Sequence, residues 1–325
     1  MRRDETIRVA VLDDYQRAAA GFADWASLGA GVAVDFLHEP VAPAEAAARL
    51  APYAVLCLMR ERMPLGADLI ARLPNLRLVV FTGARNPSLD AAALARAGVT
   101  VCHTGGGGGP ATAELATALI LACARHLPAE FAGMRAGRWQ ESVGRSLDGL
   151  TLGILGLGRI GARMAAIGRA LGMDPVAWSP NLTEERARAG GAALVDRETL
   201  LRSSDVLTLH MVLSPATRGL VGAPELALMK PGAILVNTAR GPLVDEAALV
   251  AALRDGRLAA AGLDVFDVEP LPADHPLRGL PNAVLTPHLG YVTQDTYRIF
   301  HRDTVEAIAA WRQGARVRVV APPAS

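Results

Sequence analysis

The sequence predicts an α/β protein made of two parallel-sheet lobes, and three observations carry this prediction. Strand-like and helix-like segments alternate over residues 7–102, which is typical of parallel strands joined by helical crossovers. A second alternating set begins near Leu150. The glycine run 105–109 lies between the two sets. Pro110 and a long apolar helical pattern come directly after this run. Because an ordered element begins at once, we predict a hinge between two lobes rather than a flexible linker.

The first lobe is predicted from short apolar runs that alternate with helical patterns. Continuous apolar runs of this length are typical of buried strands in a parallel sheet. The predicted strands are residues 7–12, 32–37, 55–59, 76–81 and 100–102. The predicted helices are residues 44–50, 67–72 and 88–97, and a long helix over residues 110–126 follows the glycine run.

The second lobe begins with an apolar run from Thr151 and a helical pattern over residues 162–171. Its further strands are predicted at residues 175–178, 205–210, 233–237, 260–264 and 283–285. Its further helices are predicted at residues 183–189, 198–203, 224–229 and 246–255. An amphipathic helix, residues 294–313, and a last strand, residues 316–320, complete the chain. This tail has no sheet set of its own, so we expect it to fold back onto the first lobe.

The composition excludes several classes of protein. The 325 residues carry a formal net charge of +1 without a basic or acidic block, so neither nucleic acid nor an anionic membrane is expected as the main partner. No apolar run reaches the length of a membrane span, and the first residues do not resemble a signal peptide. Cys57, Cys102 and Cys123 lack metal-binding spacing, so we expect reduced thiols in a cytoplasmic protein and no metal site.

Residues 151–161, Thr-Leu-Gly-Ile-Leu-Gly-Leu-Gly-Arg-Ile-Gly, give the strongest functional signal. An apolar run leads directly into G-x-G-x-x-G and a helical pattern, which is the order that a dinucleotide site requires. Gly156 would permit the tight turn, Gly158 would let a pyrophosphate approach the backbone, and Gly161 would let the helix pack against the strand. The free N–H groups of the helix N-terminus then attract phosphate. The sequence therefore predicts a dinucleotide-binding site here.

Three polar residues follow predicted strands of the second lobe, where ligands of open α/β sheets bind. Arg240, in Asn-Thr-Ala-Arg-Gly, is placed where its guanidinium fork could hold a carboxylate. His288, in Pro-His-Leu-Gly, could give and take a proton near neutral pH. Glu269 could orient that imidazole and stabilise its protonated form, although taken alone it would be interpreted as part of a solvated acidic turn.

The other histidines are weaker candidates for proton transfer. His210 also follows a predicted strand, but its neighbours Met211 and Val212 favour a place in the wall of a cofactor cleft. The remaining histidines have no comparable context; they are His38, His103, His126, His275 and His301.

Together these segments resemble the D-isomer-specific 2-hydroxyacid dehydrogenase family over nearly the whole chain. The shared segments are Ala113-Glu114-Leu115, Gly137-Arg138-Trp139, Pro231-Gly232, residues 237–241, Asp264-Val265-Phe266, Glu269-Pro270 and residues 287–290. The resemblance implies a flavodoxin-like substrate lobe, residues 1–104 and 292–325, and an NAD(P)-binding Rossmann lobe, residues 105–291, with a cleft between them. It also implies a homodimer formed through the 110–126 helix and the segment near Trp139.

The resemblance further implies a role for each candidate residue. Arg240, Glu269 and His288 would form the catalytic trio for reversible hydride transfer between NAD(P) and C2 of a 2-hydroxy or 2-oxo acid, with His288 as general acid and base. Substrate contacts would come from Arg60, Thr82, Gly83, Ala84, Arg240 and His288. Cofactor contacts would come from Gly156, Gly158, Arg159, Ile160, Gly161, Ser179, His210, Thr238, Ala239, Arg240, Asp264, His288 and Gly290.

The sequence departs from the family pattern at two places. Ser179 occupies the position at which NAD-preferring members carry an acidic residue for the ribose 2′-hydroxyl. A 2′-phosphate would not be repelled there, so NAD is favoured and NADP stays open; Arg186 and Arg188 are expected on a solvated helix face. In the first lobe, residues 84–87 replace a stretch that is commonly glycine-rich and acidic, and Arg85 there could contact the substrate or lie on the surface.

Several alternatives stay open at this stage. Within the enzyme class, a glyoxylate or hydroxypyruvate reductase and a phosphoglycerate dehydrogenase-like member are compatible with the motifs. The formate-oxidising branch is disfavoured because it carries glutamine where this chain has Glu269. A dinucleotide-sensing, corepressor-like interaction protein is the non-enzyme alternative. It would call for peptide-docking surfaces or disordered extensions, whereas this chain ends in a short Ala/Pro tail.

Overall fold

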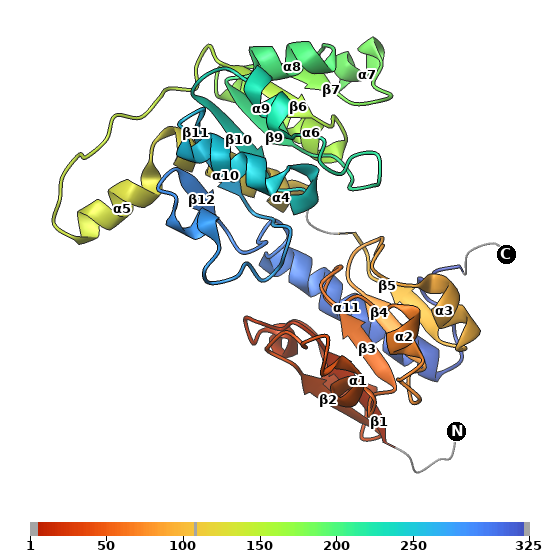
Figure 1. Cartoon of the computed structure of the whole chain (residues 1–325). Helices are drawn as coiled ribbons and strands as arrows, with labels where there is room; N and C mark the ends of the chain where they lie inside the picture. Colours follow the sequence, from red (N-terminus) through yellow and green to blue (C-terminus); the bar gives the residue numbers. More distant parts are fainter. Residues whose placement is uncertain (1–5, 107–108, 322–325) are drawn as a thin grey trace. The chain divides into compact units, whose positions relative to one another are not determined.

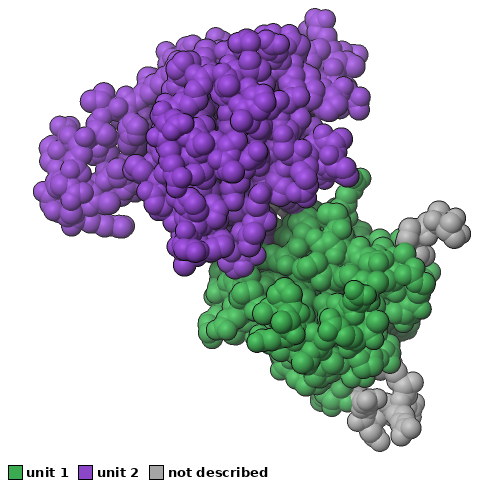
Figure 2. Space-filling model, in the orientation of Figure 1, with its two compact units in different colours: residues 1–107, 293–325 green, residues 108–292 purple. Residues whose placement is uncertain are grey.

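The computed structural model describes residues 6–106 and 109–321. The chain divides into two compact units: unit 1 comprises residues 1–107 and 293–325, and unit 2 comprises residues 108–292 (Figure 2). Unit 1 is therefore discontinuous in sequence. Gly107 and Gly108, which belong to the run for which we predict a hinge, lie outside the described residues.

Unit 1 contains a five-stranded parallel sheet in the order β2-β1-β3-β4-β5, which is the order of flavodoxin-like doubly wound sheets. The strands are β1 (Ile7–Val11), β2 (Val32–Phe36), β3 (Val55–Leu58), β4 (Leu78–Phe81) and β5 (Thr100–His103). The helices are α1 (Ala46–Leu50), α2 (Ala67–Ile70), α3 (Ala91–Arg96) and α11 (Gln294–Arg312), with the 3-10 helices η1 (Ala19–Gly21) and η2 (Trp25–Leu28). The predicted parallel-sheet first lobe is confirmed.

The core of unit 1 lies on both faces of its sheet. Neighbouring residues of a strand point to opposite faces, so Leu56 and Cys57 of β3 belong to different buried clusters. Ile308 of α11 packs in the cluster of Cys57, whereas Leu50 of α1 and Leu94 of α3 pack in the cluster of Leu56. The tail helix α11 is thus part of the core of unit 1.

Unit 2 contains a seven-stranded parallel sheet in the order β12-β11-β10-β9-β6-β7-β8. Its strands are β6 (Thr151–Leu155), β7 (Asp174–Trp178), β8 (Ala193–Leu194), β9 (Val206–Leu209), β10 (Ala233–Asn237), β11 (Leu258–Leu263) and β12 (Ala283–Leu285). The direction of winding reverses between β6 and β9. In doubly wound sheets, ligands bind outside the carboxyl ends of strands at such a switch point.

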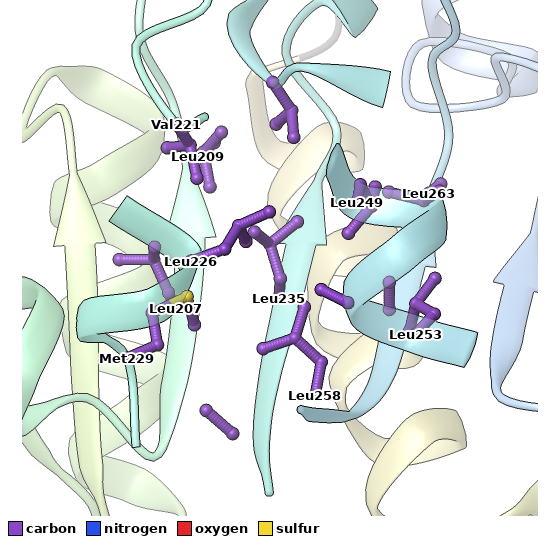
Figure 3. Close-up of a cluster of buried hydrophobic side chains, with 14 of the residues drawn as sticks. Leu207, Leu209, Val221, Leu226, Met229, Leu235, Leu249, Leu253, Leu258 and Leu263 are labelled. Carbon is purple, nitrogen blue, oxygen red and sulfur yellow. The ribbon is translucent and has the colours of Figure 1, made fainter. Parts of the chain in front are cut away.

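Helices cover both faces of this second sheet (Figure 1). The helices of unit 2 are α4 (Gly109–Ala124), α5 (Leu127–Arg135), α6 (Arg159–Ala170), α7 (Glu184–Ala189), α8 (Arg197–Ser203), α9 (Ala223–Leu228) and α10 (Glu246–Arg254), with the 3-10 helices η3 (Gly241–Leu243) and η4 (Pro276–Gly279); α5 projects from the rest of the unit. Leu235 of β10 packs with Leu253 of α10 on one face (Figure 3). The next residue, Val236, packs with Leu119 of α4 and Met164 of α6 on the other.

Two sequence-based predictions of elements need correction. The predicted strand at residues 316–320 is wrong, because only Val319 forms a bridge, antiparallel to Cys102. Arg318 has a φ of +49°, and this left-handed conformation interrupts the extended chain. The predicted helix over residues 110–126 ends at Ala124, and His126, with a φ of +51°, separates it from α5 at a bend of 68°. No single helix in the described part of the chain is long and apolar enough to cross a membrane.

Candidate active site

The glycine motif of unit 2 forms a tight turn between β6 and α6. Gly156 has a φ of +106°, and a Cβ there would lie 2.7 Å from the carbonyl oxygen of His210. A Cβ at Gly161 would lie 2.3 Å from the carbonyl oxygen of Gly156. Only glycine fits either position without displacing backbone, so these two residues set the turn and the close packing of α6 on β6.

Gly158 differs from the other two glycines because a Cβ there would meet no atom within 4 Å. It is the N-cap of α6 and has no side-chain cap, so the first N–H groups of the helix, from Arg159 onward, stay available to a ligand. This open space above a glycine, at the N-terminus of a helix and at the switch point of the sheet, fits the pyrophosphate of a dinucleotide.

The glycine geometry gives a prediction that separates folding from cofactor binding. Gly158→Ala is expected to leave the melting temperature unchanged, since the methyl group enters open space, yet to weaken NADH binding about tenfold, or ~1.4 kcal/mol. Gly161→Ala is the matched control, and overpacking there is expected to cost about 1–3 kcal/mol of stability. Fluorescence titration with NADH and thermal unfolding measure the two effects. Unchanged NADH affinity in Gly158→Ala would contradict the assigned phosphate site.

The second strand of this sheet, β7, is followed by a segment without a carboxylate. The hydroxyl of Ser179 accepts a hydrogen bond from the backbone N–H of Leu157 at 2.9 Å, which ties this segment to the glycine turn. The nearest acid, Glu184 on α7, forms an ion pair with Arg188 at 2.9 Å. Arg186 donates to the carbonyl oxygen of Asn181 at 3.0 Å. Both arginines therefore bind partners within their own segment.

Arg240 lies in a turn that the buried side chain of Asn237 organises. Asn237 Nδ2 donates to the carbonyl oxygen of Arg240 at 2.9 Å, and its Oδ1 accepts from the N–H of Ala239 at 3.0 Å. Arg240 Nη1 donates to the carbonyl oxygen of Ala239 at 2.6 Å, which restrains the guanidinium. Between them, the hydroxyl of Thr238 is buried without a hydrogen-bond partner. An unsatisfied buried hydroxyl at the carboxyl end of β10 suits a position against a bound cofactor.

The turn of Arg240 packs directly on the segment that carries Glu269. A Cβ at Gly241 would lie 2.1 Å from the carbonyl carbon of Phe266, so the two backbones meet in contact that only glycine allows. The N–H of Phe266 donates to Glu269 Oε1 at 3.0 Å and fixes the carboxylate. Sequence reasoning placed Arg240 and Glu269 in one site but missed this close approach, since a lone glycine after an arginine carries no such signal.

His288 and Glu269 form a hydrogen-bonded pair. His288 Nδ1 lies 2.5 Å from Glu269 Oε2, and the two side chains are 14% and 25% exposed. Since a carboxylate only accepts, Nδ1 carries the proton of this bond and Nε2 stays free for proton exchange. The φ of His288 is +55°, a strained conformation of the kind found at functional sites. The ring of Tyr291 packs against the imidazole edge to face, with centroids 5.5 Å apart.

The loop of His288 is fastened by the buried carboxylate of Asp264. Its Oδ1 accepts from Thr286 Oγ1 at 2.6 Å and from the N–H of Leu289 at 2.7 Å, and its Oδ2 accepts from the N–H of Gly290 at 2.8 Å. Burial raises the pKa of this carboxyl, and the hydrogen bonds act in the opposite direction. Both oxygens are thus bound to the loop, so any influence of Asp264 on a cofactor would pass through residues 286–290.

His210 lies at the end of β9 in a different environment from His288. Its Nε2 lies 2.9 Å from the hydroxyl of Thr208, and burial lowers its pKa to about 4. The imidazole is therefore neutral at neutral pH and a poor candidate for proton exchange. Its carbonyl oxygen borders Gly156, in keeping with a wall of the dinucleotide site.

In unit 1, the substrate candidates gather after β3 and β4. Arg60 has a φ of +57°, its N–H donates to Thr82 Oγ1 at 2.9 Å, and its guanidinium occupies the space in which a Cβ of Gly83 would lie. The N–H of Gly83 donates to Thr104 Oγ1 at 2.8 Å. Ala84 and its neighbour at position 85 are exposed. Within the described residues, no group of histidine, cysteine or acidic side chains could hold a metal ion.

A dinucleotide turn, an acid–base pair and an arginine on one sheet define unit 2 as the nucleotide-binding part of an NAD-dependent oxidoreductase acting on CH–OH groups. The family model "D-isomer specific 2-hydroxyacid dehydrogenase, NAD binding domain" matches residues 117–290. The chain belongs to the D-isomer specific 2-hydroxyacid dehydrogenase family. Its cofactor is NAD(H).

Individual relatives agree with this assignment. Glyoxylate reductase of Aeropyrum pernix is 42% identical over 270 residues, which cover 80% of each chain. D-3-phosphoglycerate dehydrogenase of Archaeoglobus fulgidus is 38% identical over 263 residues, but the match covers 80% of this chain and 50% of that protein. The crystal structure of phosphoglycerate oxidoreductase from Vibrio cholerae superimposes with a TM-score of 0.89 at 37% identity, covering 95% of this chain and 100% of that one.

Proposed function

We propose that this protein catalyses reversible hydride transfer at C2 of small 2-hydroxy and 2-oxo acids, with His288 as general acid and base. The observation that carries the proposal is the 2.5 Å contact between His288 Nδ1 and Glu269 Oε2, in the unit that also bears Arg240 and the glycine turn. The bond to Glu269 orients the imidazole so that Nε2 is the nitrogen that exchanges a proton with substrate.

Each side chain of the trio has a distinct task. Bound NAD(H) would supply the hydride chemistry, as acceptor in the oxidative direction and donor in the reductive direction. During reduction, His288 donates its Nε2 proton to the carbonyl oxygen of the 2-oxo acid; during oxidation it takes the hydroxyl proton back. Glu269 keeps the ring oriented and balances the charge of the imidazolium. Arg240 holds the substrate carboxylate and stabilises the negative charge that grows on the reacting oxygen.

For unit 1 we propose that Arg60 and the loop of Thr82, Gly83 and Ala84 bind the substrate carboxylate. The N–H groups of Thr82 and Gly83 already donate to Leu58 and Thr104, so the amide of Ala84 is the one we assign to the substrate. The strained backbone of Arg60, held by Thr82, supports a functional role for its guanidinium.

The experiment that tests the proposed function is a screen of 2-oxo acids with NADH and with NADPH. It includes glyoxylate, hydroxypyruvate, pyruvate and a phosphorylated 3-carbon 2-oxo acid, because the names of relatives leave both the reductase and the phosphoglycerate alternatives open. Turnover of any of them supports the proposal. Nucleotide binding without turnover of any 2-oxo or 2-hydroxy acid would contradict it and favour the dinucleotide-sensing alternative.

For the nucleotide itself, we propose that NADH binds more tightly than NADPH. No carboxylate follows β7 to repel a 2′-phosphate, so NADPH is not excluded. The arginines that could bind that phosphate already have partners: Arg186 donates to Asn181, and Arg188 pairs with Glu184. The titrations of the same screen rank the two nucleotides.

We further propose that two copies of the chain associate through α5 and the segment that follows it. Figure 1 shows this part projecting from the rest of unit 2. It carries apolar side chains that are largely exposed: Phe131 at 58%, Met134 at 59%, Trp139 at 74% and Val143 at 95%. Apolar exposure of this extent on one projection marks an interaction surface, and a second copy of the same projection offers a matching apolar face.

Trp139→Lys is expected to shift the protein from dimer to monomer. A tryptophan buried at the centre of an interface commonly contributes about 2 kcal/mol or more to binding. Loss of this contribution is expected to lower the dimer affinity about 30-fold. Sedimentation velocity across a concentration series measures the change. Leu194→Lys, on β8, is the control for an added surface charge. A wild-type chain that stays monomeric at high concentration would overturn the dimer.

We also propose a cytoplasmic location. Cys57, Cys102 and Cys123 are all free and buried. Burial raises the pKa of Cys123 to about 12, so this thiol stays protonated and unreactive. Free thiols of this kind are typical of proteins from reducing compartments.

A further inference from the structure

Glu269 lies on a largely exposed surface excursion, in which Leu271 packs against the core and the carbonyl oxygens of Leu271 and Pro272 accept hydrogen bonds from Arg278. Residues 267–274 connect the buried Phe266 to η4, and nearly all of them are exposed. Segments with few buried contacts open locally at low free-energy cost. The N–H of Phe266 fixes the carboxylate of Glu269, and the contacts that keep the rest of the excursion in place therefore help to hold Glu269 at hydrogen-bonding distance from His288.

The carboxylate of Glu246, the first residue of α10, contacts both ends of this excursion. Its Oε1 lies 2.9 Å from His275 Nε2, and its Oε2 accepts from the N–H of Asp267 at 3.4 Å. The side chains of His275 and Glu246 are 17% and 21% exposed, so water screens this contact only in part. One side chain on a core helix thus bridges the start and the end of the segment that presents Glu269.

The tautomer of His275 follows from its second contact. The N–H of Leu277 donates to His275 Nδ1 at 3.3 Å, so Nδ1 is an acceptor and carries no proton. The proton is then on Nε2, which donates to Glu246. His275 is also the N-cap of η4, whose Leu277 is fully buried in the core of unit 2. The imidazole therefore joins α10 to a firmly anchored turn.

The surroundings of this contact are acidic. Burial raises the pKa of Asp267, and the nearby carboxylates of Glu246 and Asp245 raise it further, while Arg218 and His275 act in the opposite direction. The N–H donor of His275 therefore enters a region in which carboxylates repel one another. Loss of that donor would remove the hydrogen bond that offsets the repulsion between the carboxylates of Glu246 and Asp267.

We propose that Glu246 and His275 form a latch that positions Glu269 for its hydrogen bond with His288, and so act as positioning residues for proton transfer. This inference rests on the proposed function, in which the Glu269–His288 pair moves the proton. Neither latch residue touches the reacting groups. Their effect is to keep the excursion closed against α10.

The test uses a set of substitutions that separates the latch from the cap. In His275→Asn the side-chain oxygen can still accept from the N–H of Leu277, since asparagine is a favoured N-cap, but the side chain is too short to reach Glu246. His275→Gln can still donate to Glu246. Glu246→Ala removes the acceptor, and Glu198→Ala, which removes a first-turn glutamate of α8, controls for the loss of a helix-terminal charge.

In full-length protein, His275→Asn and Glu246→Ala are each expected to lower kcat about 10- to 100-fold, the range for small displacements of a catalytic group. The KM for NADH should stay unchanged, and His275→Gln should recover most of the turnover. The double variant His275→Asn/Glu246→Ala should lose no more than either single variant, because both break the same contact. Glu198→Ala should behave like wild type.

Hydrogen exchange of residues 266–277 provides a readout that does not depend on activity. Faster exchange in His275→Asn, with slower turnover, supports the latch. Faster exchange with normal kcat would show that the latch does not serve proton transfer, and unchanged exchange would show that there is no latch. Failure of the proposed function is a separate result, since the wild-type chain would then turn over no 2-oxo acid while its exchange still responded to the substitutions.

Discussion

Replacing His288 by asparagine is expected to lower kcat about 10³-fold while leaving NADH affinity and folding close to those of the wild type. General acid–base catalysis by one side chain commonly supplies about 10²–10⁴-fold in rate. Nε2 of His288 is the ring nitrogen that does not take part in the hydrogen bond with Glu269. Asparagine is chosen because His288 has a φ of +55°, which asparagine tolerates better than alanine. Steady-state kinetics with the best 2-oxo acid from the screen measure the loss.

His126 offers a matched control for this substitution. Its φ of +51° is close to that of His288, and it lies between α4 and α5, with no part in the candidate site. In His126→Asn, asparagine must likewise adopt a positive φ, but the acid–base group His288 is retained. The turnover of this variant should therefore equal that of the wild type. A His288→Asn protein that retained more than about a tenth of wild-type kcat would remove His288 from the mechanism.

Replacing Arg240 by lysine is expected to lower kcat/KM about 10²-fold, even though the positive charge is retained. A guanidinium binds a carboxylate through two parallel hydrogen bonds, whereas an ammonium group acts as a point charge. The fork is already restrained, since Nη1 donates to the carbonyl oxygen of Ala239 and Asn237 fixes the turn. Lysine would lose both this restraint and the two-point contact. Substrate kinetics and NADH titration, run on the same preparation, measure the effect.

The two arginine variants distinguish orientation from charge. Arg240→Ala should lose more than Arg240→Lys, because it also removes the charge that stabilises the developing oxyanion. Arg218→Lys, an exposed arginine on a neighbouring loop, is the control. Full kcat/KM in Arg240→Lys would contradict the proposed two-point contact with the substrate carboxylate. A loss confined to NADH affinity would show that Arg240 binds the cofactor rather than the substrate.

The strands of both sheets could be predicted because their physical signal is local. Parallel strands are buried on both faces, so each appears as a short run of apolar residues, and the predicted strand at 233–237 coincides with β10. The predicted strand at 316–320 failed because its apolar pattern could not reveal the left-handed backbone of Arg318. The predicted end of the preceding helix, near residue 126, is close to the observed one, but helix α5, which begins after the left-handed His126, was not predicted. A left-handed conformation at a single non-glycine residue does not alter the periodic pattern of apolar residues from which helices and strands are predicted.

The residues of the candidate site could be predicted, together with the contact of Glu269 with His288, but most of its other contacts could not. Arg240, Glu269 and His288 each follow a strand, and this placement pointed to one edge of one sheet. The sequence held no sign that Asp264 would be enclosed by the loop of His288, or that His275 would meet Glu246. These contacts join residues that are 25 and 29 positions apart, and a histidine in an acidic turn has no local pattern that marks its partner.

The amino-acid order by itself determined the two sheets, the glycine turn and the identity of the three polar residues, because strand burial and turn geometry depend on neighbours along the chain. The tertiary structure alone decided which carboxylate closes the loop of His288, that His275 meets Glu246, and why Gly241 must lack a side chain. Those outcomes depend on distances between segments that the fold brings together. Such distances are set by the packing of whole layers, and no short stretch of sequence contains them.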